Sequence, residues 1–158
     1  MLKRHLAPAC LLGLFAVTGP AFAGSCPADK IVPSGQGQPK SDVKAVGVTD
    51  VVVTAIDLAT EPAAIPGRLF RLRKLTIEPG GIVPWPSHHD RPALITVVAG
   101  EIVEYSSTCA VPIVHKAGES TAETHTTEHW WKNLGTETVV LYSADLFPTT
   151  MSMDKHTM

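Results

Sequence analysis

Short runs of β-branched and aliphatic residues, each interrupted by glycine or proline, recur through most of this 158-residue chain. The run Val51–Ile56 is one example, and the segment Glu61–Gly67 with two prolines and a glycine follows it. Evenly spaced short strands are typical of β-sandwiches and β-barrels, and no segment has the periodicity of a long amphipathic helix. The sequence therefore predicts an all-β domain, with strands over residues 51–56, 68–77, 93–98, 101–105, 113–114, 129–133 and 138–146.

Glycines between these runs predict turns. Ala99-Gly100 and Leu134–Thr136 each separate two consecutive runs, which predicts two β-hairpins. Pro79-Gly80-Gly81 follows the run 68–77 and predicts a turn at its end.

One predicted strand face mixes charge with apolar residues. Every second residue of a strand points to the same face, so Arg71 and Arg73 share a face with Leu75 and Ile77. We therefore expect this face to be partly exposed to water.

Residues 1–23 have the pattern of an export signal: a basic start, an apolar stretch and the cleavage motif Ala21-Phe22-Ala23. The apolar stretch is too short to span a bilayer comfortably. We therefore expect cleavage after Ala23 and a periplasmic or secreted protein without membrane insertion. The remaining chain divides into an irregular arm (24–43), a barrel domain (44–150) and a flexible tail (151–158).

Cysteine content and charge narrow the class of protein. Cys26 and Cys109 remain after signal removal, and two thiols in an oxidising compartment favour one disulfide over two unpaired cysteines. The formal net charge of the whole chain is −2. No block of basic residues is present, which argues against a nucleic-acid partner.

Two segments carry the candidate site residues. His88 and His89 are adjacent, so in a regular strand only one of them points inward, unless the chain bulges there. In the second segment the alternating positions are Glu123, His125, Thr127 and His129, although a bend leaves the facing of the earlier ones open. An inward His129 brings Trp131 and Asn133 to the same face. His115, next to Lys116 at a turn, is expected to be exposed.

These segments resemble the two motifs of the cupin superfamily. The second motif matches Gly118, His129 and Asn133 in spacing, with Thr124 and Thr126 in place of its proline and glycine. The first motif ends at Gly100, which places its His-x-His at Pro86 and His88 and its glutamate at Ala93. The resemblance covers Arg68 to about Leu146 and implies an antiparallel jelly-roll barrel, often a homodimer, with a pocket at one mouth.

The resemblance also implies a metal, usually iron, manganese, zinc, copper or nickel held by three histidines and a glutamate. Only His88 and His129 fall on ligand positions, since Pro86 and Ala93 occupy the other two. His89 or His125 could supply a third nitrogen, and Glu123 an oxygen. The alternative is a metal-free pocket in which both imidazoles hydrogen-bond a ligand or each other.

Other residues have open roles. Arg91 could clamp a carboxylate, or it could pair with Asp90 or Glu101. Trp131 could line the pocket or belong to the core. Asn133 is expected to fix the turn before Gly135.

Two functions are compatible with these residues. The first is an exported cupin that binds a small molecule without turnover, with a reduced and possibly empty metal site. The second is a metal-dependent enzyme, of oxygenase or isomerase type, that uses His88, His129 and one substitute ligand. Three tryptophans and an exposed strand edge make a homodimer plausible.

Overall fold

The computed structural model describes residues 24–84 and 88–150. The predicted signal 1–23, the predicted tail 151–158 and Pro86 lie outside the described residues. Within the described part, the only helical segment is the single 3-10 turn η1 (Ala28–Lys30), and no helix is long and apolar enough to cross a membrane. The strands are β1 (Val46–Asp57), β2 (Arg68–Val83), β3 (Ala93–Ala99), β4 (Glu101–Ser106), β5 (Ile113–Lys116), β6 (Ser120–Glu123), β7 (His129–Lys132) and β8 (Val139–Pro148).

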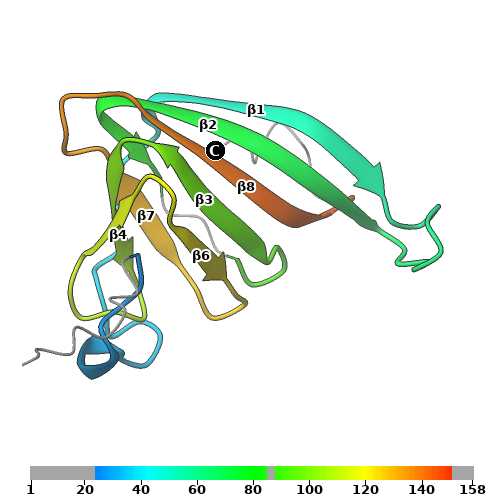
Figure 1. The fold of residues 1–158 in the computed structure, drawn as a ribbon. Coiled ribbons are helices and arrows are strands. Elements are labelled where there is room, and N and C mark those ends of the chain that lie inside the picture. The colour runs from blue at the N-terminus through cyan, green and yellow to red at the C-terminus, as the bar shows by residue number, and fades with distance from the viewer. Residues whose placement is uncertain (1–23, 85–87, 151–158) are drawn as a thin grey trace, which may run out of the picture.

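All strand pairs are antiparallel and form one sheet that curves into a nearly closed barrel (Figure 1). The hydrogen-bonded order is β5-β4-β7-β2-β8-β3-β6, and β1 adds to the outer side of β2. Strands β5 and β6 are the two ends of this order, so a seam separates them among the described strands. The predicted all-β jelly-roll fold is confirmed.

The two predicted hairpins are wrong. β3 and β4 flank Gly100, but β3 pairs with β6 and β8, whereas β4 pairs with β5 and β7. β7 and β8, on either side of Leu134–Thr136, also have other partners. In each case the chain crosses from one half of the barrel to the other. A glycine in the sequence indicates that the chain reverses direction, but it does not indicate which strand the next segment pairs with.

The predicted turn at Pro79-Gly80-Gly81 is instead a bend inside β2. β2 pairs with β8 up to Ile77 and with β7 from Ile82, so it changes partner across these residues. Gly80 has a φ of 77°, and a Cβ at Gly81 would lie 2.6 Å from Ile77 Cγ2. Asn133 holds this point: its Nδ2 donates to Ile77 O (3.1 Å) and Glu137 O (2.8 Å), and its Oδ1 accepts from Gly135 N–H (2.9 Å). Its predicted role at the turn is confirmed and extends to β2.

The inner face of β2 is dry, which corrects the expectation of partial exposure. Arg71 and Arg73 are 2% and 4% exposed. Inside the barrel they pair with Asp145 of β8 and Asp50 of β1. The apolar core lies beside them and consists of Leu75, Ile77, Val83, Ile95, Val97, Ile102, Trp131, Val139 and Leu141.

The irregular N-terminal arm is attached to the barrel by its backbone. Val32 N–H donates to Thr108 O, and Gly35 and Gly37 N–H both donate to Ser107 O. Cys26 and Cys109, the pair predicted to form a disulfide, lie with their sulfur atoms at bonding distance. The arm therefore covers one end of the barrel next to the seam (Figure 1).

Candidate metal centre

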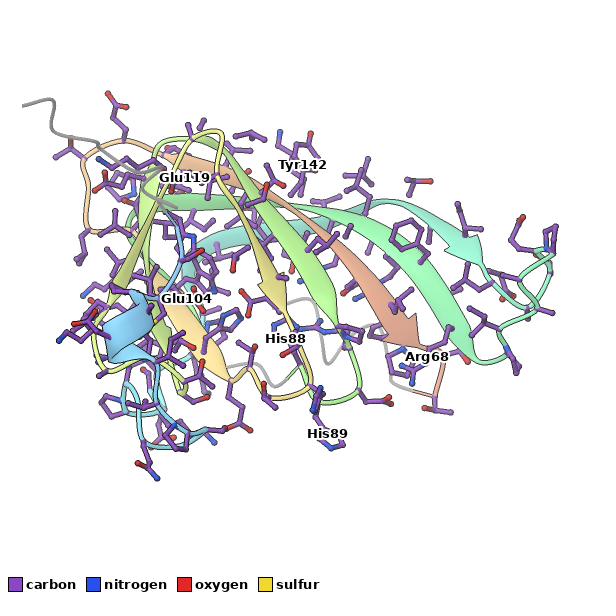
Figure 2. The ribbon with its side chains drawn as sticks, turned by 60° about the horizontal axis from the view of Figure 1, so that its bottom comes forward. Arg68, His88, His89, Glu104, Glu119 and Tyr142 are labelled. Atoms are coloured by element: carbon purple, nitrogen blue, oxygen red, sulfur yellow. A yellow bond between two sulfur atoms is a disulfide. The ribbon has the colours of Figure 1, made fainter. Side chains whose placement is uncertain are left out.

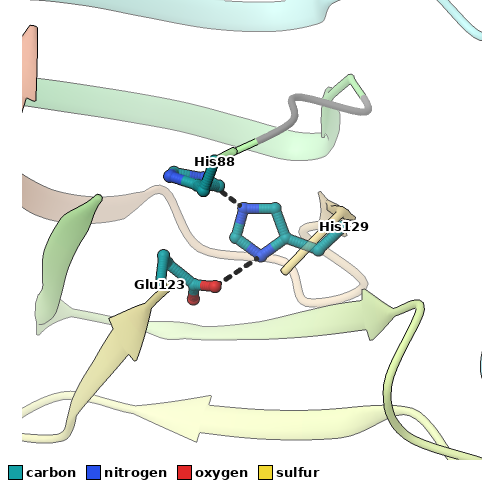
Figure 3. Close-up of side chains that lie close together, drawn as sticks. All are labelled: His88, Glu123 and His129. Carbon is teal, nitrogen blue, oxygen red and sulfur yellow. Dashed lines mark hydrogen bonds and ion pairs between the residues drawn. The ribbon is translucent and has the colours of Figure 1, made fainter. Parts of the chain in front are cut away.

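Three buried side chains from separate segments converge inside the barrel. His88 precedes β3, Glu123 ends β6 and His129 begins β7 (Figure 3). Each offers one ligand atom, and these atoms lie within 4.8 Å of one another. The residues are 3%, 2% and 1% exposed, so the cluster is shielded from water.

Two loops hold these residues in place through backbone contacts. The N–H of His88 donates to Thr127 O (3.2 Å), which ties the loop before β3 to the loop before β7. Arg91 N–H in turn donates to His88 O (3.1 Å) and closes a turn around His88. The hydroxyl of Thr127 accepts from Thr124 N–H (3.1 Å) and orders the segment between Glu123 and His129.

The hydrogen bonds assign the tautomers of the two imidazoles. His88 Nδ1 lies 2.9 Å from the carbonyl oxygen of Arg91, and His129 Nδ1 lies 2.8 Å from Glu104 Oε1. A carbonyl and a carboxylate only accept, so both Nδ1 atoms donate to them. The indole N–H of Trp131 also lies 3.1 Å from His129 Nδ1, but the shorter contact with the Glu104 carboxylate decides the assignment. The two Nε2 atoms then face each other at 3.0 Å with their lone pairs converging. Such a contact is favourable only with a proton or a cation between the nitrogens.

Burial and neighbouring charges set the protonation of the cluster. Burial, together with the charge of His129, lowers the pKa of His88 to about 3, so His88 is neutral. Burial alone would lower the pKa of His129, but the carboxylates of Glu123 and Glu104 outweigh it and raise that pKa. Burial also raises the pKa of Glu123 to about 7, and its Oε1 has no hydrogen-bond partner among the described residues. Without a cation, the bridging proton resides on His129.

Glu104 and His115 support His129 from behind. Burial would raise the pKa of Glu104, yet hydrogen bonds from His115 and His129 lower it to about 2. His115 is 1% exposed, with its Nε2 2.8 Å from Glu104 Oε2 and its ring 4.5 Å from that of Trp131. The expectation that His115 is exposed is therefore wrong. Lys116 marks the approaching turn, but it does not show that the side chain of the preceding residue, His115, points into the barrel.

A small cavity of about 30 Å³ adjoins the two histidines. Its polar lining consists of His88, His129, Arg73, Arg91 and Ser143. Its apolar lining consists of Leu75, Val83, Ile95, Trp131 and Leu141. Trp131 and Arg91 therefore lie where the pocket hypothesis requires them. Neither predicted partner, Asp90 nor Glu101, pairs with Arg91: Asp90 pairs with Arg68, and Glu101 with Lys116.

Two of the candidate ligands lie elsewhere. His89 and His125 are exposed, and neither belongs to the three-residue cluster. Figure 2 shows His88 directed between the strands and His89 directed away from them, as the alternation of adjacent residues predicts.

Sequence reasoning missed the charged residues Glu104 and Asp145. Asp145 follows Val139, Leu141 and Ser143 at every second position of β8, and all four are buried. A charge on the inward parity of an apolar strand is the feature that could have identified it.

A family model for the cupin domain matches residues 73–145. This match supports the cupin superfamily for this chain. No curated protein sequence matches it significantly.

Solved cupins have the same fold. A protein from Thermotoga maritima described as a predicted oxalate decarboxylase has a TM-score of 0.52 and 14% identity, over 78% of this chain and 98% of that chain. The cupin domain of Schizosaccharomyces pombe Cnp3 has a TM-score of 0.51 and 16% identity, over 69% of this chain and 67% of that chain. An uncharacterised conserved protein with a double-stranded β-helix domain from Klebsiella pneumoniae has a TM-score of 0.51 and 17% identity, over 74% of this chain and 87% of that chain. At these identities the likeness concerns the fold alone.

The register of this cupin explains its missing glutamate. Ala93 stands at the glutamate position of the first motif, and its cross-strand partner in β6 is Glu123. Directly paired residues have Cβ atoms about 4.5–5.5 Å apart. A carboxylate on β6 therefore reaches the region that a glutamate on β3 would occupy.

Proposed function

We propose that this cupin is a metal-dependent enzyme that holds a divalent transition metal through His88, Glu123 and His129 and acts on a small molecule in the adjacent pocket. The observation that carries the proposal is the pair of Nε2 atoms 3.0 Å apart, each freed by an Nδ1 hydrogen bond on the other side of its ring. Glu123 would supply the third donor: its Oε1 has no hydrogen-bond partner in the described residues, and its Oε2 lies 3.4 Å from Nδ1 of His129, so the carboxylate would turn toward an ion at the two Nε2 atoms.

The donor set narrows the choice among iron, manganese, zinc and copper. Two imidazoles and one carboxylate with open positions are typical of non-haem iron(II) sites and occur in catalytic zinc sites. A bound ion would supply Lewis-acid polarisation of the substrate or activation of oxygen.

The chain's own residues orient and protect this site. Glu104 and the Arg91 carbonyl fix both imidazole rings, so their Nε2 atoms need no reorganisation on binding. The apolar wall formed by Leu75, Ile95, Trp131 and their neighbours offers water few hydrogen-bond partners on that side of the pocket.

Metal loading tests the proposal directly. Purified protein is stripped with chelator, incubated separately with Fe(II), Mn(II), Zn(II) or Cu(II), desalted and analysed for metal. We expect about one ion per chain for at least one metal, since three protein ligands are the usual minimum for such sites. His88→Gln, Glu123→Gln and His129→Gln should abolish loading. The exposed histidines provide matched controls, because His89→Gln and His125→Gln should load like the wild type.

A folded wild-type protein that takes up none of these metals would overturn the proposal. The same pocket would then describe a metal-free binding module. Loading that survives His129→Gln would place the ion at a different site.

We also propose that the chain is exported. Its N-terminal pattern and the pairing of Cys26 with Cys109 support this, because disulfides persist in oxidising compartments. N-terminal sequencing of the mature protein should begin at Gly24, and a mature protein that retains residues 1–23 would contradict it.

A further inference from the structure

We infer that the pocket takes a small monocarboxylate, whose carboxylate group binds Arg91 and whose apolar part lies against the opposite wall. This inference deepens the proposed function by naming the substrate class of the same pocket.

The first observation is a buried donor without an acceptor. Arg91 is 4% exposed, and its Nη1 has no hydrogen-bond partner among the described residues. An unmade hydrogen bond from a buried charged group is costly. The position therefore calls for an acceptor that arrives with a ligand.

The second observation is that the neighbouring carboxylates are already engaged. Asp145 accepts two hydrogen bonds from the Arg71 guanidinium (2.9 and 2.7 Å), and Asp50 pairs with Arg73. Arg91 Nη1 reaches only to 3.7 Å from Asp145 Oδ2. The three guanidinium groups thus share two carboxylates in this cluster, which leaves a local excess of positive charge at the pocket.

The walls restrict the rest of the ligand. Five of the lining residues are apolar, so a short aliphatic chain suits this wall better than a sugar or a phosphate ester. The other end of the pocket, at His129, adjoins the carboxylates of Glu104 and Glu123. A second negative charge on the ligand would meet them, and this favours one carboxylate rather than two.

The position of Arg91 also connects this subsite to the candidate metal centre. Its carbonyl oxygen accepts from His88 Nδ1 (2.9 Å), so one turn of the chain carries both a candidate ligand and the guanidinium. A carboxylate bound to Arg91 therefore holds the remainder of a short molecule beside His88 and His129.

The test compares propionate with propionamide, which has nearly the same shape without the charge. Binding is followed by NMR from the Trp131 indole N–H, assigned with Trp131→Phe, in chelated and in metal-loaded protein. Because a charge-assisted hydrogen bond to a buried guanidinium is lost with the amide, we expect propionate to bind about tenfold or more tightly than propionamide. Malonate, a dicarboxylate, should bind more weakly than propionate to chelated protein.

Variants assign the effect to Arg91. Arg91→Gln should reduce propionate affinity by about tenfold or more, and the matched control Arg68→Gln, at the Asp90 pair outside the pocket, should not change it. Equal affinity for propionate and propionamide, or no binding of propionate to folded wild-type protein, would overturn the inference. This wild-type comparison decides the matter even if Arg91→Gln does not fold.

The outcomes separate this inference from the proposed function. Protein that binds propionate through Arg91 but loads no metal would contradict only the metal proposal. Protein that loads metal at His88 and His129 but does not distinguish propionate from propionamide would contradict only the carboxylate subsite.

Discussion

Glu104 accepts hydrogen bonds from two buried imidazoles at once, 2.8 Å from His129 Nδ1 and 2.8 Å from His115 Nε2. A carboxylate in this position orients a metal-binding histidine and makes it more basic. We therefore treat it as a positioning residue. We expect Glu104→Gln to lower zinc affinity by about 10–100-fold, because an amide cannot accept from both rings with the same charge.

Competition with a colorimetric chelator measures this change. Glu101→Gln is the matched control: the same substitution on the same strand, at an exposed residue whose carboxylate pairs with Lys116 (3.5 Å). An unchanged affinity in Glu104→Gln would show that the ring of His129 is held by other contacts.

Proton competition should make metal binding depend on pH. The folded pKa of His129 is raised by Glu123 and Glu104 against the effect of burial, so a proton on its Nε2 competes with a metal and must leave when the metal binds. Glu123, whose pKa burial raises to about 7, must also be ionised to act as a ligand. We expect the apparent affinity to fall by at least about tenfold per pH unit below pH 7 and to level off at higher pH. Isothermal titration in buffers of different ionisation enthalpy would count the released protons, and a flat pH profile would contradict this assignment.

At the scale of the elements, sequence reasoning locates the strands better than it pairs them. It identifies the runs that form β3, β4 and β8, because alternation and turn residues are local properties. Their partners depend on which half of the barrel the chain enters after each reversal, which no local pattern records. The bend at Gly80 is missed for a related reason, since a glycine at positive φ serves a turn and a partner change equally well.

The candidate site is predictable to a similar extent. His88, His129 and Glu123 are candidates from the sequence because cupin spacing and strand parity apply to them. The sequence does not show that Glu123, rather than His89 or His125, is the third member of the cluster, because this depends on the register between β3 and β6. Sequence reasoning passes over Glu104 and His115 as contributors because they support the ligands rather than occupy a motif position.

For the whole molecule, the link between the arm and the barrel is the feature most open to experiment. A cleft of about 410 Å³ lies between the arm at Gly24, Ser25, Cys26 and Ile31 and the carboxylates of Glu104 and Glu123 near the seam. The arm therefore stands between solvent and the rear of the candidate metal centre.

Removing the bridge should loosen this cover. We expect the double variant Cys26→Ser/Cys109→Ser to lose about 2–4 kcal/mol in the free energy of unfolding, because the link spans 83 residues. Urea unfolding measures this loss. We also expect a chelator to remove bound zinc faster from the double variant than from the oxidised wild type, and equal removal rates would show that the arm does not limit access.

The pairing of Ala93 with Glu123 places a carboxylate directly across the strand pair from the alanine, so in the proposed metal site the acidic donor comes from the facing strand. An alanine at one motif position is therefore a poor sign of a metal-free barrel when the facing strand carries a carboxylate. For this chain, whether a metal is held therefore depends on the strand that faces the first motif, and not on that motif alone.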